Sequence, residues 1–140
     1  MIDQRELPIP TPETKHFWEG TQLGELRIQQ CRECSKNYFP PRHFCPGCGS
    51  KKIFVFNASG NATLHSYVIS HIPAPGIEAP YAIAVAKLEE GPKMMCNILN
   101  CAQTPEALVL DMPIKVIFKK MSDEITLPQF EPSNRKTNET

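Results

Sequence analysis

Two CxxC pairs constrain this chain more than any other feature of its sequence. Cys31 and Cys34 form the first pair, Cys45 and Cys48 form the second, and ten residues separate the pairs. Two residues between cysteines allow a tight turn that directs both sulfurs at one point, and two such turns supply the four thiolates that tetrahedral zinc prefers. The spacing therefore predicts a closed, structural zinc site with these four ligands and no open position for a substrate.

Iron and disulfide bonds are the two alternatives for these cysteines. A single iron is also held by four cysteines in two knuckles in rubredoxin, but rubredoxin-type carriers have the site as their main content. Here most of the chain follows Cys48 and needs its own explanation. Disulfides belong to oxidising compartments, and nothing else in the chain favours a secreted scaffold. Zinc is the metal that we expect.

The charge balance and the N-terminal residues bear on partners and compartment. Lysine plus arginine equals aspartate plus glutamate, at 15 each, which argues against a dedicated nucleic-acid binder. No run of 18 apolar residues is present, and residues 1–6 lack the apolar core of a signal peptide. We therefore expect no membrane contact and a cytoplasmic location, where thiols stay reduced. Cys96 lies in an apolar stretch and is predicted to be a small buried residue without an activating base.

A short helix is predicted near the N-terminus, after an arm made extended by its prolines. Thr11 suits the N-cap and Pro12 the first helical position. Phe17 and the only tryptophan, Trp18, are the apolar residues of this helix, and one of the next two glycines ends it. A helix of this length needs a docking surface.

The remainder of the chain is rich in short strand-like runs. β-branched and aromatic residues cluster between turn-like breaks, with no convincing helical period after residue 50. The pattern predicts a small antiparallel barrel of the OB-fold size. We expect an arm and helix over 1–25, a rubredoxin-like zinc ribbon over 26–52, a barrel over 53–132 and a disordered tail over 133–140. The predicted strands after the ribbon are 53–56, 62–71, 81–88, 94–100, 114–119 and 125–130.

Helix, ribbon and barrel in this order resemble a known family, the OB-fold, acyl-CoA-associated zinc-ribbon proteins, formerly a domain of unknown function. The resemblance covers residues 10–132. One departure from the family pattern is Asp111, which stands where the family has glycine before the Met112–Pro113 strand start; aspartate tolerates a left-handed turn. The matching stretches are 12–20, 26–34, 40–42, 45–50, 59–64, 90–92, 112–116 and 127–132.

The resemblance implies that this chain is a non-catalytic subunit, with ribbon and helix facing a partner enzyme. Relatives are encoded with thiolase-like enzymes or associate with hydratases, and an archaeal relative bridges a thiolase and hydroxymethylglutaryl-CoA synthase. The resemblance thus implies a scaffold of a thiolase-superfamily complex that helps to handle a CoA-bound intermediate. No histidine is paired with a nucleophile at a telling spacing, which agrees with a subunit that has no catalytic residues of its own.

Two binding roles remain as alternatives. Acyl-CoA binding by the chain itself needs cations for the CoA phosphates, and Arg42, Lys51 and Lys52 flank the second knuckle. Binding of single-stranded nucleic acid is the other alternative, because OB barrels use a basic groove and stacking aromatics for it. The same three cations, Arg27 and Arg32 are the basic candidates for that role, together with the aromatic residues Tyr38, Phe39, Phe54 and Phe56.

Overall fold

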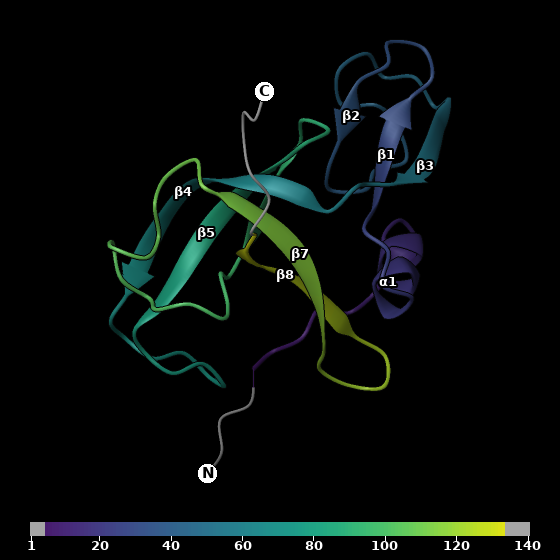
Figure 1. Ribbon diagram of the computed structural model, residues 1–140. Helices are drawn as coiled ribbons and strands as arrows, with labels where there is room; N and C mark the ends of the chain where they lie inside the picture. Colours follow the sequence, from purple (N-terminus) through teal and green to yellow (C-terminus); the bar gives the residue numbers. More distant parts are fainter. Residues whose placement is uncertain (1–4, 134–140) are drawn as a thin grey trace.

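A three-stranded sheet and a curled five-stranded sheet lie side by side, with one helix against both (Figure 1). The computed structural model describes residues 5–133. Its described part is mostly β, with an N-terminal helix, a zinc ribbon and an antiparallel half-barrel of OB-fold type, as the sequence predicts. Of the predicted tail, Ser133 alone falls within the described residues. No helix among the described residues is long and apolar enough to cross a membrane.

Helix α1 (Lys15–Gln22) begins later than the sequence predicts. Thr14, not Thr11, is the N-cap, because residues 11–14 form a separate turn in which the Thr14 N–H donates to the Thr11 carbonyl oxygen at 3.0 Å. The Thr11 N–H in turn donates to Thr14 Oγ1 at 2.9 Å, so this hydroxyl is not available as a helix cap. The helix ends at Gln22, with Leu23 as its C-cap, followed by Gly24 in a left-handed conformation with φ 78°.

The ribbon sheet has the order β2-β1-β3 and is antiparallel throughout. Strand β1 (Arg27–Cys31) runs into the first knuckle, β2 (Asn37–Tyr38) leaves it, and β3 (Ile53–Asn57) follows the second knuckle. Leu26 and Ile28 are fully buried and belong to the same apolar cluster as the barrel residues. The inner end of the ribbon is therefore part of the common core, and its knuckles project away from that core (Figure 1).

The five-stranded sheet has the order β6-β5-β4-β7-β8. Its strands are β4 (Asn61–Ser70), β5 (Tyr81–Leu88), β6 (Lys93–Cys96), β7 (Pro113–Lys120) and β8 (Thr126–Pro132). A parallel bridge between Ile98 and Phe130 brings the segment after β6 against β8 and so curls the sheet. Helix α1 contacts β1 on one side and β7 and β8 on the other, which fixes the ribbon against the barrel.

A β-bulge at His65 changes which face of β4 is buried. The register with β5 shifts between Leu64 and Ser66, so even-numbered residues point inward before the bulge and odd-numbered ones are more buried after it. His65 is exposed at this bulge, and His71 lies beyond the strand end. The even spacing of His65 and His71 in the sequence therefore does not place them on one face of β4.

Strand β6 is shorter than the predicted 94–100 strand. It ends at Cys96 because the next N–H, that of Asn97, donates to the side-chain oxygen Oε1 of Gln129 at 2.7 Å and not to a neighbouring strand. The later turn at Asp111 behaves as expected, since its φ of 68° is left-handed. Asp111 thus adopts the left-handed turn that aspartate tolerates.

Candidate functional site

The two knuckles have the same local geometry. In each, the residue four positions after the first cysteine is left-handed, Ser35 with φ 63° and Gly49 with φ 81°, and donates its N–H to the carbonyl oxygen of that cysteine at 2.9 Å. The N–H groups of Glu33 and Gly47 each point at the first sulfur of their knuckle, at 3.3 Å. Of the two glycines in the second knuckle, Gly49 alone is left-handed, because Gly47 has no positive φ.

The four knuckle sulfurs converge on one point. Their Sγ atoms all lie within 4.8 Å of one another, and the Cys31–Cys48 and Cys34–Cys45 sulfurs are 3.6 Å apart. A tetrahedral zinc with Zn–S bonds of about 2.3 Å places its sulfurs about 3.8 Å apart, so the arrangement fits a zinc site with four cysteine ligands. None of the four sulfurs is bonded to another. The chain therefore positions four cysteines for a metal.

The thiol pKa values differ within the cluster because four sulfurs this close cannot all be negative without a cation. The Cys34 backbone N–H lowers the pKa of Cys31. At Cys45, burial raises the pKa most, but the N–H groups of Cys48 and Gly47 and the neighbouring thiols outweigh it and bring the pKa to about 6. At Cys48, the Ser50 N–H lowers the pKa, yet hydrogen bonding to Cys31, burial and the other thiols raise it to about 12. A bound dication removes this conflict.

The three cations expected near the second knuckle do not share one pocket. Arg42 lines a shallow groove together with Lys36, whereas neither Lys51 nor Lys52 lines it. Lys52 instead pairs with Glu33, with 3.4 Å between Nζ and Oε2. Lys51 is exposed. A role for all three in phosphate binding remains a prediction.

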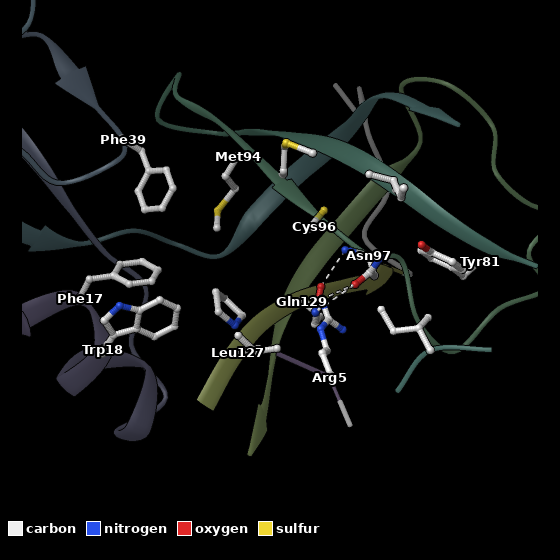
Figure 2. Close-up of a pocket in the computed structure, with 14 residues that line it drawn as sticks. Arg5, Phe17, Trp18, Phe39, Tyr81, Met94, Cys96, Asn97, Leu127 and Gln129 are labelled. Atoms are coloured by element: carbon white, nitrogen blue, oxygen red, sulfur yellow. Dashed lines mark hydrogen bonds between the residues drawn. The ribbon is translucent and has the colours of Figure 1, made fainter. Parts of the chain in front are cut away.

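An apolar groove lies between α1 and the open side of the barrel (Figure 2). Its volume is about 410 Å³, and its walls come from the N-terminal arm, α1, the end of β2 and strands β5, β6 and β8. Phe17, Trp18 and Phe39 form a cluster of rings at one end. Phe17 packs edge-on against Trp18 with ring centroids 4.9 Å apart, and its centroid lies 5.2 Å from that of Phe39.

A polar triad lies farther along the same groove (Figure 2). Arg5 Nη2 donates to Asn97 Oδ1 at 3.0 Å, and Gln129 Nε2 donates to the same oxygen at 3.3 Å. Asn97 Nδ2 donates to the Ala82 carbonyl oxygen at 2.8 Å. Gln129 is buried, so the amides are held rigidly by one another and by the barrel. Sequence reasoning missed this triad, because its members are far apart in the chain.

The two remaining cysteines are not nucleophiles in their resting state. Burial raises the pKa of the Cys96 thiol to about 12, and the Ala86 backbone only partly opposes this. Burial also raises the pKa of Cys101. Both thiols therefore stay protonated near neutral pH, and only the thiolate is strongly nucleophilic. Cys96 is half-buried and lines the apolar groove.

The fold and the metal-binding geometry together define a protein made of a rubredoxin-like zinc ribbon joined to an OB-fold half-barrel. Residues 18–53 match the family described as "ChsH2, rubredoxin-like zinc ribbon domain", and residues 57–119 match "ChsH2, C-terminal OB-fold domain". The chain belongs to this family, whose members include the DUF35 scaffold proteins.

Curated relatives fall into two groups of different length. A "DUF35 domain-containing scaffold protein" of Methanothermobacter thermautotrophicus is 30% identical over 80% of this chain and 86% of its own length. A "Probable enoyl-CoA hydratase alpha subunit" of Thermomonospora curvata is 34% identical over 84% of this chain. This chain spans only 37% of the length of that hydratase subunit, so the activity of the longer protein does not transfer directly.

Two solved structures have the same architecture. One, described as "Ltp2-ChsH2(DUF35) aldolase", superposes with a TM-score of 0.80 at 31% identity, covering 90% of this chain and 98% of that chain. The other, a DUF35-family protein of unknown function from Sulfolobus solfataricus, has a TM-score of 0.63 at 16% identity over 87% of this chain and 86% of its own, which shows the fold alone.

Proposed function

We propose that this chain is a zinc-containing, non-catalytic accessory subunit of an acyl-CoA-processing enzyme complex, with a thiolase-like enzyme as its partner. The observation that carries the proposal is the match to nearly the whole ChsH2 chain of an aldolase complex, at a level of identity that reaches beyond fold. Hydratase alpha subunits contain the same module, which favours partners that act on CoA thioesters. In such a complex the chain orders the assembly, and catalysis belongs to the partner.

Zinc is the proposed metal, held by Cys31, Cys34, Cys45 and Cys48. The matched family is described as a zinc ribbon, and four sulfurs with N–H groups directed at them suit zinc in a structural role. With all four positions filled by sulfur, the metal supplies no Lewis acid to a substrate. It stabilises the fold of the knuckles, and through them the surface that is presented to a partner.

The partner surface that we propose is formed by the ribbon and α1. Leu23, Phe44 and Val55 are large apolar side chains that are exposed there, and exposed apolar residues are typical of the centre of an interface. The barrel has exposed apolar residues of its own, including Val68 and Leu110, which line one groove. These two regions can be tested separately.

Co-purification tests the proposal directly. The tagged, zinc-loaded chain is expressed in its native host, captured at moderate salt and analysed by mass spectrometry. We expect stoichiometric recovery of a thiolase-like enzyme, with hydroxymethylglutaryl-CoA synthase as a second component where the complex is of the archaeal type. Phe44→Glu should abolish recovery and Leu110→Glu should not. Recovery without any CoA-processing enzyme, or equal recovery with both variants, would contradict the proposed partner or the proposed surface.

The structure gives little support to nucleic-acid binding. Tyr38 is 4% exposed and cannot stack on a base. The Arg32 guanidinium lies over the Phe54 ring, 4.0 Å from its centre, and so covers the face on which a base would stack. Arg27 pairs with Glu25 at 2.8 Å. Arg27, Arg32, Tyr38 and Phe54, four of the residues proposed for this role, are thus engaged within the chain. A low-salt gel shift with single-stranded DNA and RNA should show no complex at micromolar protein.

A further inference from the structure

The apolar groove beside α1 contains a cation, Arg5, that has no anionic partner among residues 5–133. Of the fourteen described residues that line the groove, Arg5 is the only charged one. It is half-buried, and within residues 5–133 its guanidinium makes one hydrogen bond, to Asn97, and no ion pair. A partly desolvated guanidinium gains most from a carboxylate or phosphate, which its planar set of donors fits.

The position of Arg5 is fixed by the shape of the barrel loop beneath it. Gly76 has φ 75°, and a Cβ atom at this position would overlap the Arg5 backbone. Only a glycine therefore allows the arm to lie this close to the loop. Together with the hydrogen bond to Asn97, this contact holds the guanidinium beside the groove.

The walls between Arg5 and the aromatic end favour a hydrocarbon chain. Met94 and Leu127 lie between the two in Figure 2, and neither has a strong hydrogen-bonding group. A peptide in this stretch would leave its amide groups unpaired, at a cost that a methylene chain avoids. Methionine side chains also adapt to ligands of different shape, and Met95 lies exposed at the rim of the groove. The volume of about 410 Å³ falls within the range of small-molecule sites.

We propose that this groove binds the apolar chain of an acyl compound, with the anionic group of that compound paired with Arg5. The anion is either the carboxylate of a free acid, which ends the methylene chain directly, or a phosphate of a CoA thioester, whose pantetheine amides would then have to stay outside the apolar stretch; both anions present the same oxygen chemistry to the guanidinium. The choice of an acyl ligand rests on the proposed function, whereas the groove and its single cation are features of this chain alone. The site differs from the Arg42, Lys51 and Lys52 region.

Trp18 provides the measurement, because it is the only tryptophan of the chain and lines the groove. The full zinc-loaded chain is titrated with decanoate, decanoyl-CoA and 1-decanol below their aggregation limits, and Trp18 emission is recorded. We expect saturable changes with at least one anionic probe and an affinity about tenfold lower for 1-decanol, which lacks the charge-assisted bond. Saturation by decanoate alone identifies the carboxylate as the ligand of Arg5, and saturation by decanoyl-CoA alone identifies the phosphate.

Two pairs of matched variants locate the site. Met95→Glu places a negative charge in the groove, while Val68→Glu does the same at a similarly exposed strand position outside it, with the native side chains 70% and 62% exposed. Arg5→Gln removes the anion partner, and Lys93→Gln removes an exposed charge next to the groove. Binding should be lost in Met95→Glu alone, and the preference for anions should be lost in Arg5→Gln alone.

Clear results would overturn the proposal. They are the absence of saturation with all three probes, equal affinity for 1-decanol and the anions, or equal effects within either pair of variants. Circular dichroism and bound zinc report whether each variant is folded. Enzyme capture is measured separately, so failure of capture with intact probe binding would remove the subunit assignment and leave the groove site standing.

Discussion

The knuckle region and the barrel are stabilised in different ways. Across residues 32–52, only Tyr38, Pro41 and Cys45 are buried. Strand β5 by itself buries four side chains, three alanines and Leu88, with regular alternation. A segment that buries so little apolar surface cannot offset the entropy of ordering its backbone. The outer ribbon therefore depends on a metal cross-link, whereas the barrel depends on its core.

The boundary between the part of the fold that depends on the metal and the part that depends on the apolar core runs through β1 and not between the two sheets. Ile28 is fully buried in the common core, and three residues later Cys31 is a proposed metal ligand. Helix α1 packs on this inner end through Phe17. Loss of metal should consequently disorder the knuckles and spare the start of β1. Four changes, in decreasing order of expected effect, test this division.

Removal of one knuckle sulfur should have the largest effect. Cys48→Ser is expected to abolish tight metal binding and to unfold the outer ribbon, because metal binding in such modules contributes on the order of 10 kcal/mol to folding. Metal content and amide hydrogen exchange measure the two effects, with exchange rising over residues 31–52 and not in β4 or β5. Cys101→Ser, outside the cluster, is the control and should retain its metal. Unchanged metal content in Cys48→Ser would refute the four-sulfur site.

A core truncation should give the reverse pattern. Phe130 is fully buried and bridges β8 to Ile98. Phe130→Ala should lower the free energy of unfolding by about 3–5 kcal/mol through the cavity that it leaves. Urea unfolding followed by fluorescence measures this loss, and metal content below the midpoint should equal that of the wild type. Release of the metal in parallel with unfolding of the barrel at low urea would show that the two regions are one cooperative unit.

The link between the two regions is the third test. Gly60 has φ 89°, and a Cβ there would lie 2.7 Å from Val116 Cγ1. Gly24 has a similar φ of 78° but open space around the same position. Gly24→Ala should cost about 1 kcal/mol from the left-handed backbone alone, and Gly60→Ala should cost at least about 1 kcal/mol more because Val116 must move. Equal melting temperatures for the two variants would exclude a tight contact at the link.

The smallest expected effect is a pH dependence at His16. Burial lowers the pKa of this half-buried imidazole, Arg27 adds to the effect and Glu19 partly opposes it. The unfolded chain therefore binds the proton first as pH falls through the ordinary histidine pKa of 6.5, so stability present above this pH is lost below it. His16→Gln should reduce the slope of unfolding free energy against pH in this range, and His71→Gln, at an exposed site, should not. Identical slopes in all three proteins would contradict the assignment.

What the sequence predicts well is what depends on local spacing. The knuckles follow from CxxC geometry, the 81–88 strand is observed with those bounds, and Asp111 takes the left-handed turn. The early helix start is an error from a local turn at residues 11–14, whereas the other differences arise where distant side chains decide the outcome. Strand β6 stops at Cys96 because the Asn97 N–H donates to Gln129, and the groove contains a cation because Arg5 is brought to Asn97. No local pattern encodes either contact.

The order of the two sheets along the chain has a consequence for synthesis. Strands β1 to β3 are complete at Asn57, so the four cysteines can capture a metal while the later strands have yet to leave the ribosome. The barrel cannot curl shut until Phe130 has emerged, because this residue makes the bridge to Ile98. During that interval Leu26 and Ile28 lack their barrel contacts and can pack only against α1. The metal-bound ribbon can thus serve as a template on which the barrel strands assemble as they are made.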